Sequence, residues 1–127
     1  MAGYVGNIEK ITEENTNFRQ VVFTGKYSQL VVMSLLPGEE IGEEVHPMVD
    51  QFFRIEVGNA DIIIDGEKHS VGEGDAIVVP AGSRHNVINT ATDKPLKLYT
   101  IYSPPNHPDG TIHKTKAEAL AYEAAHH

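Results

Sequence analysis

Residues 74–89 read Gly74-Asp75-Ala76-Ile77-Val78-Val79-Pro80-Ala81-Gly82-Ser83-Arg84-His85-Asn86-Val87-Ile88-Asn89. The β-branched run that ends at Pro80 is typical of a strand, and Gly82 supplies the turn that follows it. A second strand then begins at His85. The stretch therefore places an imidazole at the mouth of a β-structure, where a metal ion could hold it.

The rest of the chain continues this pattern of short strands separated by turn residues. Asp65-Gly66 is a strong signal for a tight type I′ hairpin. Strands this short and this regularly interrupted favour a sandwich or barrel over a parallel α/β sheet, and the length suits one domain, residues 1–127. The predicted strands are 18–23, 29–36, 51–57, 60–64, 67–71, 76–79, 85–89 and 96–102.

The character of the sequence changes after Tyr102. Residues 103–110 contain three prolines and a glycine, which predicts an ordered loop over the barrel. Thr115 followed by Glu118 forms a capping-box pattern, so we expect a helix from about Thr115 to Ala125. Leu120, helped by Tyr122, is its expected apolar anchor. Residues 103–127 thus form a C-terminal loop and α-helix.

The composition excludes several classes of protein and partner. The 127 residues have a formal net charge of −8, which argues against nucleic acid and anionic membranes as partners. No signal peptide and no membrane-spanning stretch is expected. Cysteine is absent, so thiolate ligands and disulfides are excluded. A cytoplasmic location fits these observations.

A second segment supplies partners for His85. Glu44 and His46 are two residues apart, so they share a face of an extended chain. A short turn then returns the chain to Gln51, which opens the next strand and can face the same pocket. Asp50 competes for this position, but strand alternation puts it on the opposite face if Gln51 points inward. Oxygen and imidazole donors suit a divalent ion of manganese, iron, cobalt, nickel or zinc. The predicted metal ligands are Glu44, His46, Gln51 and His85.

These two segments resemble the two motifs of the cupin family. The second motif is matched completely, and the first, over residues 38–58, is matched in spacing. Glu44 stands where the family has its first histidine, and Gln51 where it has glutamate. The resemblance implies an all-β fold, a jelly-roll or double-stranded β-helix barrel, with the C-terminal helix added to it. The second motif, residues 74–89, is carried by Gly74, Pro80, Gly82, His85 and Asn89.

Four ligands on an octahedral ion leave two adjacent positions for a small substrate that chelates through two oxygens. The favoured function is therefore a metal-dependent enzyme acting on a small oxygenated metabolite, with sugar or uronate isomerisation through a metal-stabilised enediolate. The alternatives are an iron-dependent dioxygenase, a non-catalytic binding or sensing module, and a barrel whose altered ligand set holds no metal. The catalytic acid or base is unassigned. The candidates are Tyr102 on the last strand, and His107 and His113 in the loop, which could close over the pocket as a lid.

The resemblance also implies a homodimer. Cupins often exchange an N-terminal strand, and residues 4–11 together with the C-terminal helix are the candidate segments.

Overall fold

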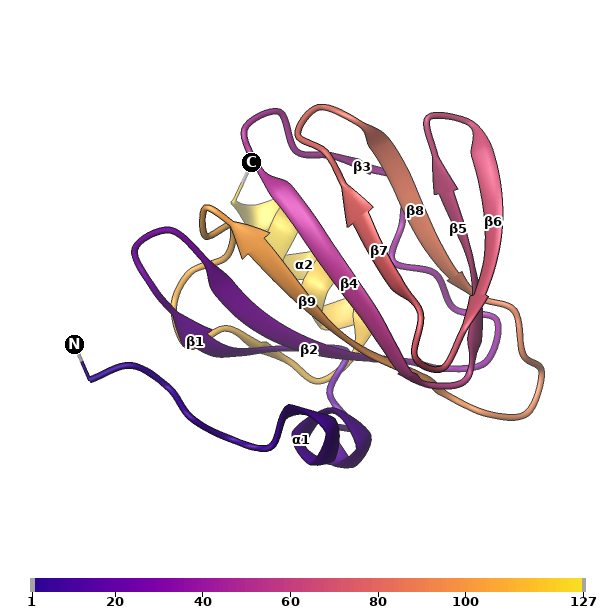
Figure 1. Cartoon of the computed structure of the whole chain (residues 1–127), viewed down its shortest axis with the longest axis horizontal. Coiled ribbons are helices and arrows are strands. Elements are labelled where there is room, and N and C mark those ends of the chain that lie inside the picture. Colours follow the sequence, from indigo (N-terminus) through magenta and orange to yellow (C-terminus); the bar gives the residue numbers. More distant parts are fainter. Residues whose placement is uncertain (1, 127) are drawn as a thin grey trace.

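The computed structural model describes residues 2–126, which form a two-sheet barrel with a short helix at each end of the chain (Figure 1). Both sheets are antiparallel throughout, as expected for strands joined by short turns. The expected all-β fold with a C-terminal helix is confirmed. The six-stranded sheet has the order β10-β1-β2-β9-β4-β7, and the four-stranded sheet the order β3-β8-β5-β6. The elements are α1 Ile8–Glu14, β1 Arg19–Thr24, β2 Gln29–Leu35, β3 Glu44–Val45, β4 Asp50–Val57, β5 Asn59–Ile64, β6 Glu67–Gly72, β7 Ala76–Val79, β8 Arg84–Asn89, β9 Leu96–Ser103, β10 Ile112–His113 and α2 Lys116–Ala125.

The core lies between the two sheets, because alternate side chains of each strand point into the barrel. β9 shows this most clearly, with every second residue from Leu96 to Tyr102 buried. The six-stranded sheet contributes Phe53, Ile55 and Leu98 to the core, and the facing sheet contributes Ile62 and Val87.

Asn89 ties the strands together at one end of the barrel. Its buried amide nitrogen donates to the carbonyl oxygens of Leu35, Leu36 and Lys94, at 3.1–3.2 Å. Its Oδ1 atom accepts from the backbone N–H of Ala91 at 3.0 Å. One amide side chain thus satisfies backbone groups from two segments, the end of β2 and the loop between β8 and β9, which explains why an asparagine follows His85 at this distance.

Two turns agree with the sequence prediction. Asp65 and Gly66 both have positive φ, 49° and 83°, as a type I′ hairpin between β5 and β6 requires. α2 begins after Thr115, whose hydroxyl accepts from the N–H of Glu118 at 3.1 Å.

The helices depart from expectation in two places. Residues 8–11, which were expected in an exchanged N-terminal strand, lie in α1, where Asn7 caps the helix by accepting from the Lys10 N–H. Leu120 was predicted to anchor α2, but its side chain is 53% exposed. Ala119 is the buried residue of α2, so the buried face of the helix lies one position earlier in the sequence than predicted.

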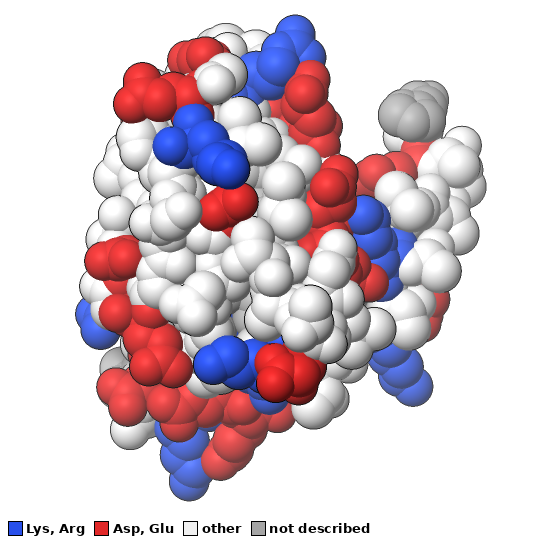
Figure 2. Space-filling model, turned by 90° about the vertical axis from the view of Figure 1, so that its right-hand side faces the viewer, with Lys and Arg blue, Asp and Glu red and all other residues white. Residues whose placement is uncertain are grey.

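Charged side chains are spread over the surface. Figure 2 shows acidic residues interspersed with basic ones around the edge of one face, whose middle is largely uncharged. No helix within residues 2–126 has the length and apolar character needed to cross a membrane.

Candidate metal centre

All four predicted ligands meet inside the barrel, and we call them the four-donor cluster. Glu44 on β3 lies directly opposite His85 on β8, and His46 follows β3. The donor atoms of Glu44, His46 and His85 lie within 4.8 Å of one another. Gln51 reaches the same point from β4 of the other sheet, with its Oε1 atom 3.2 Å from His85 Nε2.

The backbone explains why Gln51 and not Asp50 faces the cluster. Gln51 is buried in the alternating pattern of β4, whereas Asp50 is exposed. The Asp50 carboxylate accepts from the N–H of Ala81 at 2.8 Å and so fixes the turn that precedes β8. In the same turn, the Gly82 N–H donates to the carbonyl of His46 at 2.9 Å. The two loops that carry His46 and His85 are therefore bonded to each other.

The hydrogen bonds of His85 leave one lone pair facing another. Its Nδ1 atom lies 3.1 Å from the Ser83 carbonyl, which can only accept, so Nδ1 carries a ring proton. Its Nε2 atom then presents a lone pair to Gln51 Oε1, itself an acceptor. The Gln51 amide nitrogen is directed away and donates to Thr100 Oγ1 at 3.0 Å. Two lone pairs in a buried pocket repel each other unless a proton or a metal cation lies between them.

His46 has a buried Nε2 atom with no hydrogen-bond partner in the described chain. The nearest carboxylate oxygen, on Glu44, is 3.6 Å away. Burial lowers the pKa of His46, and the neighbouring His85 and Arg19 charges lower it further, so its imidazole is neutral. A buried, neutral and unpaired imidazole nitrogen has its lone pair available for a metal ion.

The donor spacing fits a single ion. Donors bound about 2.1 Å from one metal lie roughly 3.0 Å apart in octahedral geometry and roughly 3.4 Å apart in tetrahedral geometry. The observed separations are 3.2 Å for Gln51 and His85, and 3.6 Å for Glu44 and His46. Burial also raises the pKa of Glu44 to about 7, against the opposing Arg19 charge. The residues present therefore fit a divalent cation.

Tyr102 and His107 form a second polar pair beside the cluster. The Tyr102 hydroxyl lies 3.2 Å from His107 Nε2, and the Tyr102 ring meets the His46 ring edge-on at 5.9 Å. Burial raises the pKa of Tyr102, and burial followed by the Arg19 charge lowers that of His107 to about 3. Both groups are neutral near pH 7. A proton can therefore be shared between Tyr102 Oη and His107 Nε2.

The loop carrying His107 is held by Gln29. The Gln29 Oε1 atom accepts from the N–H groups of Asn106 and His107, and its Nε2 atom donates to the His107 carbonyl at 2.7 Å. His113, the other lid candidate, lies elsewhere. It pairs with Arg19 across β10 and β1, and its ring packs 5.4 Å from that of Tyr122 on α2. The structure therefore brings Tyr102 and His107 to the cluster, whereas His113 packs against the helix.

Arg19 is the site residue that sequence reasoning missed. It is 2% exposed, lies on β1, and its charge acts on Glu44, His46, Tyr102 and His107. A signal was available, because Arg19 shares strand parity with Val21, which faces the core.

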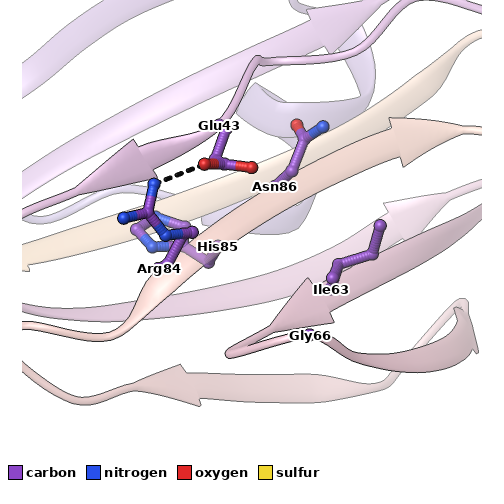
Figure 3. Close-up of a pocket in the computed structure, with 6 residues that line it drawn as sticks. All are labelled: Glu43, Ile63, Gly66, Arg84, His85 and Asn86. Carbon is purple, nitrogen blue, oxygen red and sulfur yellow. Dashed lines mark hydrogen bonds and ion pairs between the residues drawn. The ribbon is translucent and has the colours of Figure 1, made fainter.

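A separate cavity of about 140 Å³ lies on the outer face of β8 (Figure 3). Arg84 forms an ion pair there with Glu43, and the lining residues are Glu43, Ile63, Gly66, Arg84, His85 and Asn86. Successive side chains of β8 point to opposite faces, so the buried His85 ring points into the barrel, away from this cavity. The outer cavity is therefore not the metal centre.

Comparison with known proteins places these features in context. The family model described as "Cupin domain" matches residues 31–102, the span that contains the four-donor cluster. The uncharacterized protein YrkC of Bacillus subtilis is 52% identical over 94% of this chain and 67% of its own length. An uncharacterized protein of Acanthamoeba polyphaga mimivirus is 48% identical over 86% of this chain and 70% of its own. The crystal structure of BH2720 from Bacillus halodurans superposes with a TM-score of 0.91 at 45% identity, covering 93% of each chain.

Proposed function

This chain belongs to the cupin family, and we propose that it is a metal-dependent enzyme acting on a small oxygenated metabolite, with sugar or uronate isomerisation as its reaction. The observation that carries the proposal is the four-donor cluster. It presents the unpaired Nε2 of His46 and the opposed lone pairs of His85 and Gln51 to one point in the barrel. Fold alone would not support a reaction, because one barrel can serve many chemistries.

The ion would be held by Glu44, His46, Gln51 and His85. Imidazole with oxygen donors suits divalent manganese, iron, cobalt, nickel or zinc. When bound, it supplies Lewis-acid polarisation of a substrate carbonyl. Gln51 contributes a neutral oxygen where carboxylate would add charge, so Glu44 is the anionic donor of the set.

The remaining residues would orient the substrate and move its proton. Isomerisation requires a proton to leave one position of the substrate and a proton to return at the neighbouring one. Tyr102 Oη and His107 Nε2 form the neutral pair placed beside the cluster, so they are the candidates to exchange that proton. Phe53 is fully buried and packs against His85, with ring centroids 6.2 Å apart, so it would keep water from that side of the cluster.

The test is turnover by protein loaded with each candidate metal against a panel of sugars, sugar phosphates and uronates. Isomerisation is expected to persist without oxygen and to fall sharply in Tyr102→Phe, which retains the ring but removes the hydroxyl. Activity that stops under anaerobic conditions would replace the proposal with dioxygenation. Tight ligand binding with no turnover across the panel would indicate a binding or sensing module.

A further inference from the structure

Arg19 is a buried cation without a counterion. Its side chain is 2% exposed, and its Nε atom has no hydrogen-bond partner. Within residues 2–126, no carboxylate lies within 4.0 Å of its guanidinium. The guanidinium lies 5.3 Å from the centroid of the Phe18 ring and hydrogen-bonds the neutral Tyr102 hydroxyl, so neither contact supplies a negative charge.

This arrangement is costly unless a ligand completes it. An arginine does not escape burial by losing its proton, and a buried unpaired charge costs several kcal/mol. The titratable groups around Arg19 do not balance its positive charge. Tyr102, His46 and His107 are neutral, and Glu44 would be committed to the metal ion.

The net charge of the site with a metal ion bound also favours a negatively charged ligand. A divalent ion, the Glu44 carboxylate and the Arg19 guanidinium sum to +2 in an enclosed space. A neutral sugar would leave this charge unbalanced, whereas an anionic substrate would reduce it. Arg19 also lies beside the Tyr102 hydroxyl, so an anion bound there would sit next to the Tyr102–His107 pair.

We propose that Arg19 binds the carboxylate of the substrate, which makes the substrate a small hydroxy- or oxo-carboxylate whose other oxygens face the four-donor cluster. The inference rests on the proposed function and narrows its substrate class. A guanidinium matches a carboxylate with two parallel hydrogen bonds. Phosphate shares this chemistry, but within the described chain Arg19 is the one buried Lys or Arg side chain, which suits a monoanion better than a dianion.

The test measures binding by calorimetry with zinc-loaded protein and three probes: lactate, its neutral analogue lactamide, and inorganic phosphate. Arg19→Gln is compared with wild type and with Arg84→Gln, a matched control whose exposed guanidinium pairs with Glu43 on the outer face. Lactate affinity is expected to fall about 30-fold or more in Arg19→Gln, the loss typical of a buried charge pair. Lactamide affinity should change little, and Arg84→Gln should behave as wild type.

The outcomes separate the two proposals. Failure of wild type to bind zinc would overturn the metal-dependent function. Zinc binding with the same lactate-to-lactamide ratio in wild type and Arg19→Gln would overturn only the role of Arg19. Phosphate binding tighter than lactate, lost in Arg19→Gln, would replace carboxylate by phosphate.

Two further measurements cover the case in which Arg19→Gln does not fold. Arg19→Lys keeps the charge but loses the paired donors, so its lactate affinity should fall below that of wild type while its preference for lactate over lactamide is reduced but not lost. Metal-free wild type should still prefer lactate to lactamide, by about tenfold. Equal affinities there would refute the assignment.

Discussion

Replacing His85 by alanine is expected to remove most of the thermal stabilisation that zinc gives to this protein. The variant deletes one imidazole of the four-donor cluster and leaves Glu44, His46 and Gln51 in place. Since loss of a residue that merely orients a ligand costs 10- to 100-fold in metal affinity, loss of the ligand itself should cost about 100-fold or more.

That loss of zinc affinity corresponds to a measurable difference in the zinc-induced rise of Tm. Zinc at 100 times its dissociation constant stabilises the folded state by about 2.7 kcal/mol. Unfolding entropy of about 2.1 cal/mol/K per residue gives roughly 0.27 kcal/mol/K for 127 residues, so wild type should gain about 10 °C in Tm. At the same zinc concentration, His85→Ala would sit near its own dissociation constant and gain about 0.4 kcal/mol, or roughly 1.5 °C.

The assay is differential scanning calorimetry of each variant with and without zinc. The alanine variant also leaves a cavity in the core, but the zinc-induced shift is measured within one variant and is insensitive to that cost. His69→Ala is the control, because His69 is exposed on β6 and lies away from the cluster. A wild-type zinc shift in His85→Ala would refute the assignment of this centre.

Three other predictions follow from the same contacts. Gln51→Glu should raise zinc affinity about tenfold or more, because it adds a second anionic donor, and competition with a chromophoric chelator measures this effect. The same variant should lower the stability of the metal-free protein, because a second buried carboxylate would face Glu44, and urea unfolding measures that loss. Metal binding should release more protons at pH 6 in wild type than in Glu44→Gln, and equally few at pH 8.5, in a weakly buffered indicator titration. The sign follows because burial raises the folded-state pKa of Glu44 from 4.5 to about 7, so between these values the metal-free protein holds a proton that the ion must displace. The same shift makes Glu44 lower the stability of the metal-free protein as pH rises through this range. Asn89→Ala should cost about 2–4 kcal/mol in urea unfolding with an unchanged m-value, because three backbone carbonyls lose their donor; a loss below about 0.5 kcal/mol would contradict this account of Asn89.

Strand alternation made much of the site predictable from sequence. Parity put Gln51 inward and Asp50 outward, and the structure agrees because the Asp50 carboxylate is engaged with the turn at Ala81. Turn chemistry was equally informative, since Asp65 and Gly66 have the positive φ values that their hairpin demands.

The sequence predictions that were missed or wrong have physical reasons. Arg19 escaped attention because a charged residue in a strand usually faces water, and this expectation outweighed the parity that Arg19 shares with the inward-facing Val21. α1 was missed because it is short and mostly polar, and its stability comes from packing against the sheet, including a bond from Lys97 Nζ to the Glu13 carbonyl. The sequence of α2 is rich in alanine and has no continuous apolar stripe, so it did not predict which residue of the helix is buried.

The four-donor cluster also bears on how the two sheets of the barrel are held together. Glu44 and His85 come from the four-stranded sheet and Gln51 from the six-stranded one, so an ion held by them would cross-link the two layers of the barrel. A protein without cysteine has no disulfide to serve that purpose. The layers could separate only after the cross-link broke, so metal occupancy would slow unfolding and lengthen the lifetime of the folded chain, and a chelator would shorten it.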